Sequence, residues 1–403
     1  MSGASSREVL SHYAKKNSQQ LERILHFWTS RTDDAAYGGY ITCFDEAGAI
    51  TSSEKNIWMN ARQTWLFSTI AFDSGNTDFL ALAESGYTFI TEHAYAGNGQ
   101  WHYLLDQDGS PRITTLSVLT DMFCLMALGA FERANGMDPS RCFLETASGV
   151  QAKLFGDQEM SLYPQTVGSD VIVHSPYMIA INAFSEVRTQ LPAGEADGVI
   201  RFCISHIFEH LYSHERSLVY ELRSTQRDND ISDELAVINP GHIFESMGFI
   251  AKEAKRLGMR REYNLSLDAI QKVFAVSYDP LHGGILHMLT MDGSLCEYKD
   301  WNEQRNLQAT DKVWWTHAEA LYALLLAYYE RRNPEDLEHF SALFDWCENY
   351  FWDDAVGEWD MILERDGKKK LSLKGGLQKA AFHVPRSLYA MQAIFALLVG
   401  GKA

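Results

Sequence analysis

The chain has 403 residues, of which 53 are acidic and 35 basic, so its formal net charge is −18. A surplus of this size repels phosphate backbones and anionic lipid, which excludes nucleic acid and membrane surfaces as expected partners. Hydrophobic residues make up 46 % of the chain and aromatic residues 12 %, enough for a sizeable core and for a cavity with aromatic walls.

Most of the sequence has the spacing of α-helices. The first apolar stripe consists of Leu21, Ile24, Leu25 and Trp28, which recur every three or four positions. The same pattern predicts helices over residues 11–29, 57–72, 116–133, 178–190, 199–212, 242–257, 317–331, 337–350 and 386–398. No strand–helix alternation suggests a parallel sheet, so the predicted fold class is all-α.

Four short segments interrupt the helical pattern and resemble one another. Each begins with Gly, continues with an alternation of apolar residues and ends in a turn of the Asp-Gly type, which predicts a β-hairpin arm. They span residues 38–48, 99–109, 283–293 and 357–367. Their spacing fits a repeat of roughly 60–70 residues, enough for two helices and a connection. Six such units predict a single (α/α)6-barrel domain over residues 1–403, with the hairpin arms at one end.

Two observations predict a cytoplasmic location. The six cysteines are scattered and have no metal-binding spacing, as expected for reduced thiols. The first residues lack the apolar region of a signal peptide, and no apolar run reaches the ~18 residues that a membrane helix needs.

The segment 58–65 predicts an arginine in an aromatic cavity. Trp58, Arg62 and Trp65 fall on one side of a helix. An arginine between two tryptophans can be a stacked surface residue, or it can hold a sugar oxygen and stabilise the negative charge of an enediolate. In a second helix, Trp315 and Glu319 share a face, so Glu319 is either solvated or placed to bind hydroxyls of a sugar stacked on the indole.

Two histidines lie beside prolines that begin helices. Pro240 and Gly241 place His242 in a first turn, where Glu245 is three residues away and can orient the imidazole or raise its pKa. A metal site is disfavoured here, because no third ligand has useful spacing. His383 precedes Pro385 in the same way. Imidazoles titrate near neutral pH, so a pair of them suits the removal and return of a proton at carbon.

Four motifs in this order resemble the N-acylglucosamine 2-epimerase family, whose mammalian members are also called renin-binding protein. The motifs are Trp58-x3-Arg62-Gln63-x-Trp65, Asn239-Pro240-Gly241-His242-x2-Glu245, Trp314-Trp315-x-His317-x-Glu319, and Lys374-Gly375-Gly376 followed by Phe382-His383-Val384-Pro385-Arg386. The resemblance implies an (α/α)6 barrel and reversible epimerisation at C2 between N-acetylglucosamine and N-acetylmannosamine. It implies catalytic roles for Arg62, His242, Glu245, Glu319 and His383, and substrate contacts for Trp58, Trp315, His174, Tyr177, Asn182 and His317.

The resemblance also bears on substrate and partners. Relatives that act on unsubstituted sugars carry an additional histidine, and the corresponding position here is Ile179, which favours the N-acyl sugars. The expected mechanism uses two histidine bases and no metal or redox cofactor. Some members respond to ATP, and the sequence has no Gly-rich phosphate loop, so nucleotide binding is left open. A homodimer is expected from the family. The alternatives are an aldose–ketose isomerase or a 2-epimerase acting on unsubstituted sugars (mannose, glucose or sulfoquinovose), a glycoside hydrolase using Glu245 and Glu319, and a non-catalytic renin-binding protein.

Overall fold

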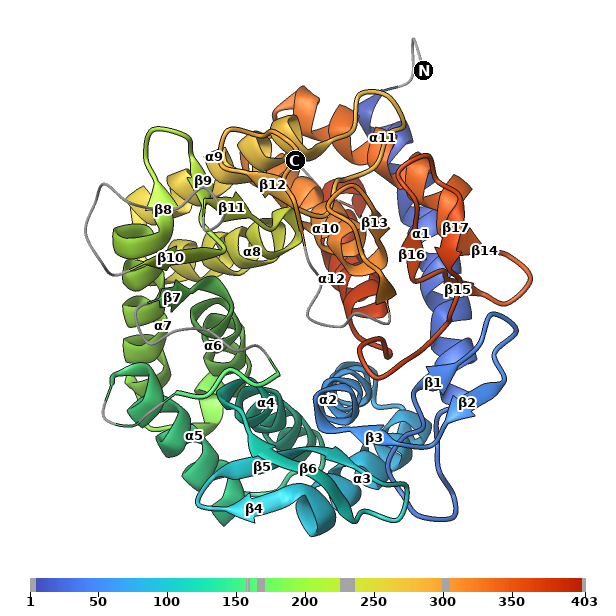
Figure 1. The fold of residues 1–403 in the computed structure, drawn as a ribbon, viewed down its shortest axis with the longest axis vertical. Coiled ribbons are helices and arrows are strands. Elements are labelled where there is room, and N and C mark those ends of the chain that lie inside the picture. Colours follow the sequence, from blue (N-terminus) through green and yellow to red (C-terminus); the bar gives the residue numbers. More distant parts are fainter. Residues whose placement is uncertain are drawn as a thin grey trace.

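The computed structural model describes residues 5–156, 158, 160–164, 171–224, 236–298 and 305–400, and the predicted domain, 1–403, includes residues outside these ranges. In the described part, twelve α-helices alternate between an inner and an outer ring (Figure 1). The inner ring consists of α2 (Ile57–Ser74), α4 (Val118–Ala134), α6 (His174–Val187), α8 (Pro240–Leu257), α10 (Trp314–Arg331) and α12 (His383–Gly400). The outer ring consists of α1 (Ser6–Thr29), α3 (Thr77–Phe89), α5 (Arg141–Leu154), α7 (Glu195–His206), α9 (Arg260–Ser277) and α11 (Pro334–Tyr350). This confirms the predicted (α/α)6 barrel.

Neighbouring inner helices pack side by side from α2 through α12, and most inner helices also pack against the outer helix that follows them. Side chains close the ring between its first and last members. The Gln63 Oε1 atom accepts a hydrogen bond from the Ala381 backbone N–H at 3.2 Å, and the Tyr389 hydroxyl donates to Asp73 at 2.9 Å. The core therefore fills the space between two concentric layers of helices.

The two ends of the barrel differ in the length of their connections. At one end, inner helices turn into outer helices through very short links. One of these is Gly258 and Met259 between α8 and α9, where Gly258 has a φ of 72°. At the other end, longer segments return from an outer helix to the next inner helix, and these segments carry the strands. The N-termini of all six inner helices therefore lie at the strand-bearing end.

The strands are short and mostly form two-stranded antiparallel arms, in agreement with the predicted hairpins. The paired strands are β1 (Cys43–Phe44) with β2 (Ile50–Ser52), β7 (Val171–Val173) with β10 (Leu222–Ser224), β8 (Tyr212–Ser213) with β9 (Leu218–Val219), β11 (Val237–Ile238) with β12 (Leu289–Thr290), and β14 (Trp352–Asp353) with β15 (Glu358–Trp359). Two larger sheets combine β3 (Lys55–Asn56), β4 (Tyr95–Gly97), β5 (Gln100–Leu105) and β6 (Pro111–Leu116), and β13 (Lys312–Val313), β16 (Ile362–Leu363) and β17 (Lys369–Leu371). Three single-turn helices complete the chain: η1 (Ile90–Ala94), η2 (Arg188–Gln190) and η3 (Ile207–Leu211).

Buried lysine–aspartate pairs fix the strands that precede two inner helices. Lys55 of β3 lies 2.9 Å from Asp34, and Lys312 of β13 lies 3.3 Å from Asp279. Both lysine side chains are fully buried. Each ammonium also donates to the carbonyl of a glycine, Gly38 or Gly284, that follows its aspartate. The repeated geometry places β3 and β13, and with them the starts of α2 and α10, in equivalent positions.

Three outer helices, α3, α5 and α9, were absent from the helices predicted by periodicity. In α3 only Ala83, Gly86 and Phe89 are buried, and two of these are small, so its apolar stripe is weak. In contrast, α9 carries a regular stripe that includes Leu267, Ile270 and Phe274, which the sequence could have revealed. No described helix combines the length and the apolar character that crossing a bilayer requires.

The buried pair of β13 generates a prediction about stability. Replacing Asp279 with Asn removes the carboxylate that compensates the fully buried ammonium of Lys312. Because an unpaired buried charge is strongly unfavourable, we expect the free energy of unfolding to fall by about 3–5 kcal/mol in urea titrations. The matched control is Arg141→Ala, which breaks the exposed pair between Arg141 and Glu145 and should leave the unfolding midpoint unchanged. Equal midpoints for Asp279→Asn and the wild type would contradict this account.

Candidate active site

A cavity of about 510 Å³ lies at the strand-bearing end of the barrel. All six inner helices contribute residues of their first turns to its wall, namely Trp58, Leu119, Ser175, His242, Trp315 and His383. Helix N-termini carry a partial positive charge, and here six of them point toward one space. The arrangement therefore favours a bound group on which negative charge develops.

His242 is held by a carboxylate from outside its own helix. Its Nδ1 atom lies 2.9 and 3.0 Å from the two carboxylate oxygens of Glu221, which precedes β10. A carboxylate can only accept, so Nδ1 carries the proton and Nε2 is the atom available to a ligand. Glu245 was predicted to orient this imidazole. The structure assigns that contact to Glu221, while the charge of Glu245 still acts to raise the pKa of His242.

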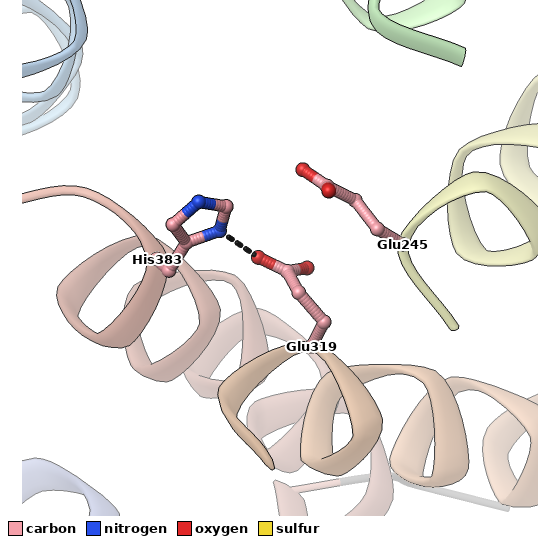
Figure 2. A group of neighbouring side chains, drawn as sticks. All are labelled: Glu245, Glu319 and His383. Atoms are coloured by element: carbon pink, nitrogen blue, oxygen red, sulfur yellow. Dashed lines mark hydrogen bonds and ion pairs between the residues drawn. The ribbon is translucent and has the colours of Figure 1, made fainter. Parts of the chain in front are cut away.

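His383 has the same arrangement with a different carboxylate (Figure 2). Its Nδ1 atom donates to Glu319 Oε1 at 2.7 Å, and Arg386 donates to the other oxygen of Glu319. Glu319 is fully buried and does not line the cavity, so the structure places it neither in solvent nor in the wall beside Trp315 but behind His383. Its position behind the imidazole leaves Nε2 of His383 as the atom that can take up a proton from a ligand.

The pKa values of the two histidines shift in opposite directions although each has a carboxylate partner. Burial acts to lower the pKa of His242, but the charge and hydrogen bond of Glu221 outweigh it, so the pKa is raised. Burial lowers the pKa of His383 to about 4 in spite of Glu319, and the positive charges of Arg62 and Arg386 contribute to this. Of the two rings, His383 is therefore the weaker base and His242 the one that holds a proton more readily.

Arg62 lies in the cavity wall among aromatic rings. Its guanidinium carbon is 4.0 Å from the ring centre of Phe123 and 4.8 Å from that of Phe382. Its Nε atom is buried and has no hydrogen-bond partner among the described residues. Burial lowers the pKa of Arg62 to about 10, which still leaves it charged at neutral pH. A cation held by rings rather than by a carboxylate keeps its donors for a ligand.

The indole of Trp315 lies close to both histidines. Its ring centre is 5.1 Å from that of His242 and 5.5 Å from that of His383. This approach requires Gly241, because a Cβ atom there would lie 2.4 Å from the indole. Both imidazoles thus border one space, as a two-base reaction requires. Trp58 lines the same cavity, whereas Trp65 lines a smaller cavity deeper in the barrel.

Glu245 extends from α8 toward His383 and Glu319 (Figure 2), and these three side chains bring donor atoms within 4.8 Å of one another. Arg386 already provides a cation to this group, since it binds Glu319 and lies 3.9 Å from Glu245. Burial, followed by the nearby charge of Glu319, raises the pKa of Glu245. Glu245 is therefore suited to hold a proton at the cavity wall.

Four further predicted substrate contacts do not reach the cavity. His317 is buried behind α10, where its ring bonds to Val313 and Ile285 and stacks on Trp346. Tyr177 stacks on His206 at 4.0 Å, and Asn182 lines the smaller cavity. His174 is fully buried and meets the ring of His242 edge-on at 6.4 Å. None of the four lines the 510 Å³ cavity, so their contacts with a substrate stay predictions.

Three residues of this centre were missing from the predicted set. Arg386 follows His383 in its motif, so its spacing along α12 was a usable signal. No local sequence pattern pointed to Glu221 or His287, because they lie in connections whose folding brings them beside His242. His287 lines the cavity, and burial lowers its pKa to about 3, so it adds a neutral imidazole to the wall.

Comparison with known proteins places this arrangement in a family. A family model described as N-acylglucosamine 2-epimerase (GlcNAc 2-epimerase) matches residues 39–385. The human N-acylglucosamine 2-epimerase is 25 % identical, covering 98 % of this chain and 93 % of its own length. A cellobiose 2-epimerase from Ruminococcus albus is 21 % identical over 84 % of this chain and 87 % of its own.

A solved structure of cellobiose 2-epimerase from Bacillus thermoamylovorans superposes with a TM-score of 0.79 at 18 % identity, covering 95 % of this chain and 99 % of the other. The structural likeness agrees with the barrel described above. The motifs around the two histidines fall within the matched range, 39–385, and the sequence match extends over almost the whole chain. The chain therefore belongs to the N-acylglucosamine 2-epimerase family of carbohydrate isomerases.

Proposed function

We propose that the protein interconverts N-acetylglucosamine and N-acetylmannosamine by moving a proton at C2. The observation that carries the proposal is the pair of imidazoles that border one cavity, with ring centres 5.1 and 5.5 Å from that of Trp315, and whose pKa values shift in opposite directions. A two-base inversion needs a neutral imidazole that can accept a proton and a protonated imidazole that can donate one, on opposite sides of the reacting carbon. The names of the matched relatives support the choice of sugar.

In the proposed reaction, the sugar ring first opens to the aldehyde, which makes the C2 proton acidic. The neutral His383 removes this proton, and the positive charge of Arg62 stabilises the enediolate oxygen. The protonated His242 then delivers its proton to the opposite face of C2. The reverse reaction exchanges the two roles. Glu319 and Glu221 keep the Nδ1 protons in place, so that Nε2 of each ring does the chemistry.

The geometry disfavours a glycoside hydrolase. Such an enzyme needs two carboxyl groups that flank the scissile bond. Glu319 is enclosed by His383 and Arg386 and does not border the cavity, so it has no access to a glycosidic oxygen. The aldose–ketose isomerase and the non-catalytic binding protein are distinguished by the experiments below. The cytoplasmic location stays a prediction from the cysteines and the first residues, the homodimer stays a prediction from the resemblance, and the binding of ATP stays open.

Exchange of either histidine tests the two-base scheme. We expect His242→Asn and His383→Asn each to lower kcat by about 10²–10⁴-fold in both directions, because each removes one proton carrier. The double variant should be little worse than either single one, since the residues act in one relay. NMR in D2O follows the reaction. The wild type should give an epimer labelled at C2, whereas a ketose product would indicate an isomerase.

The exposed His12 provides the matched control, and His12→Asn should retain full activity. Thermal unfolding of all variants shows whether the fold is kept. Near wild-type turnover in His383→Asn would rule out the two-base scheme, and a wild type inactive on every reducing sugar would favour the binding protein.

The protonation states predict the pH profile. In this scheme activity requires neutral His383 and protonated His242, so it should fall below pH about 4 and again above the raised pKa of His242. Glu221 acts to raise the latter pKa. We therefore expect Glu221→Gln to move the alkaline limb of kcat/KM to lower pH and to leave the acidic limb in place. An unchanged alkaline limb would show that Glu221 does not control His242.

A further inference from the structure

A second cavity, of about 150 Å³, lies within the inner ring. Helices α2, α6, α8, α10 and α12 supply its wall. On each of these helices the lining residues follow those that reach the catalytic cavity, so the second cavity lies toward the end with the short links. No described residue lines both cavities. A ligand in the second cavity is therefore separate from the reacting centre.

Two opposite charges face the second cavity without a partner. Lys252 of α8 is exposed, and Glu186 of α6 is half-buried. Neither side chain forms an ion pair with another described residue. Glu186 Oε2 accepts a hydrogen bond from Trp65 Nε1 at 3.1 Å, and Glu186 Oε1 has no donor among the described residues. Opposite charges that share a cavity without pairing leave room for a ligand that carries both signs.

The other charged side chains of the described wall are compensated within the protein. Glu253 lies 2.6 Å from Arg256. Arg386 donates a hydrogen bond to the buried carboxylate of Glu319. The charges left for a ligand are therefore one ammonium group and one carboxylate. A simple anion or a simple cation would compensate only one of them.

A neutral polar group accompanies each of the two unpaired charges. Burial raises the pKa of Tyr322, and the nearby positive charge of Lys252 acts against this shift. The Tyr322 hydroxyl has no hydrogen-bond partner among the described residues, and its oxygen is accessible. Asn182 precedes Glu186 by four residues on α6, so the two share a face. Asn182 Nδ2 donates weakly to the sulfur of Met126 at 3.7 Å, and Asn182 Oδ1 has no donor in the described part of the chain.

We propose that the second cavity binds a small α-amino acid as its zwitterion. Lys252 and the Tyr322 hydroxyl donate to the carboxylate, and Glu186 and Asn182 accept hydrogen bonds from the ammonium group. Charge-assisted hydrogen bonds at both ends offset the loss of hydration that the burial of a zwitterion costs. Because an α-amino acid carries both charged groups on one carbon, a single small molecule satisfies all four side chains.

The size and the apolar part of the cavity limit the side chain of this ligand. A volume of about 150 Å³ offers the space of roughly five water molecules. Trp65, Ile181, Phe249 and Ala390 supply the hydrocarbon part of the wall. The expected ligands are therefore amino acids with a short side chain, such as alanine.

A set of ligands with the same carbon skeleton separates the contributions of the two charges. L-Alanine, L-lactate and propanoate share a carboxylate, and their α-carbons carry an ammonium group, a hydroxyl group and hydrogen. Ligand-observed NMR titrations of the full chain measure the three dissociation constants. We expect propanoate to bind about 10- to 100-fold more weakly than L-alanine, because it lacks the charged hydrogen bonds to Glu186. Equal affinities for the three ligands, or no binding of L-alanine, would overturn the proposal.

Three variants test the assignment of each end of the ligand. Lys252→Gln should weaken the binding of all three ligands about tenfold or more, because it removes the cation that faces the carboxylate. Tyr322→Phe should act in the same direction, since it removes the second donor. Glu186→Gln keeps an acceptor for Trp65 and should abolish the preference for L-alanine over L-lactate. Unchanged binding of L-alanine in Lys252→Gln would overturn the site.

The matched control is Lys255→Gln, the same change on the same helix. Lys255 pairs with Glu330 at 2.6 Å and does not line the second cavity, so this variant should bind L-alanine like the wild type. Loss of binding in Lys255→Gln would show that the charge of α8 as a whole, rather than the cavity, attracts the ligand, and would also overturn the site. Thermal unfolding of every variant verifies that the fold is kept.

Discussion

The carboxylate of Glu319 joins the two inner helices on which the catalytic centre depends. It projects from α10, and its oxygens accept hydrogen bonds from His383 and Arg386 of α12. A fully buried carboxylate is tolerated only if it is paired and hydrogen-bonded, so the packing of α10 against α12 and the orientation of His383 are fixed together. The same interaction determines which nitrogen of His383 faces the cavity.

The two imidazoles show that similar hydrogen bonds can accompany opposite pKa shifts. Burial acts to lower the pKa of His242, but the charge and hydrogen bond of Glu221 outweigh it. Burial lowers the pKa of His383 in spite of Glu319, whose charge is shared with Arg386. The proposed transfer of a proton between two bases would use this difference.

The barrel places polar and apolar parts of the cavity wall on different inner helices. Short links at one end and strand-bearing connections at the other bring six helix N-termini to a common opening. Consecutive helices then differ, because α8 and α12 bring His242, Glu245 and His383 to the cavity, whereas α2, α4 and α6 line it mostly with apolar residues. Buried pairs such as Lys312 with Asp279 hold the strands that begin this arrangement.

The sequence by itself determined the helical class, the repeat and the motifs around Arg62, His242 and His383. Their signals are local, since periodicity, Pro-started helices and short motifs need only neighbouring residues. Only the tertiary structure decided the partners of the two imidazoles. It placed Glu221 on His242 instead of Glu245, moved Glu319 behind His383, and left His317 and Tyr177 outside the cavity. These are contacts between residues far apart in the chain, and they depend on how complete helices pack, which no local pattern specifies.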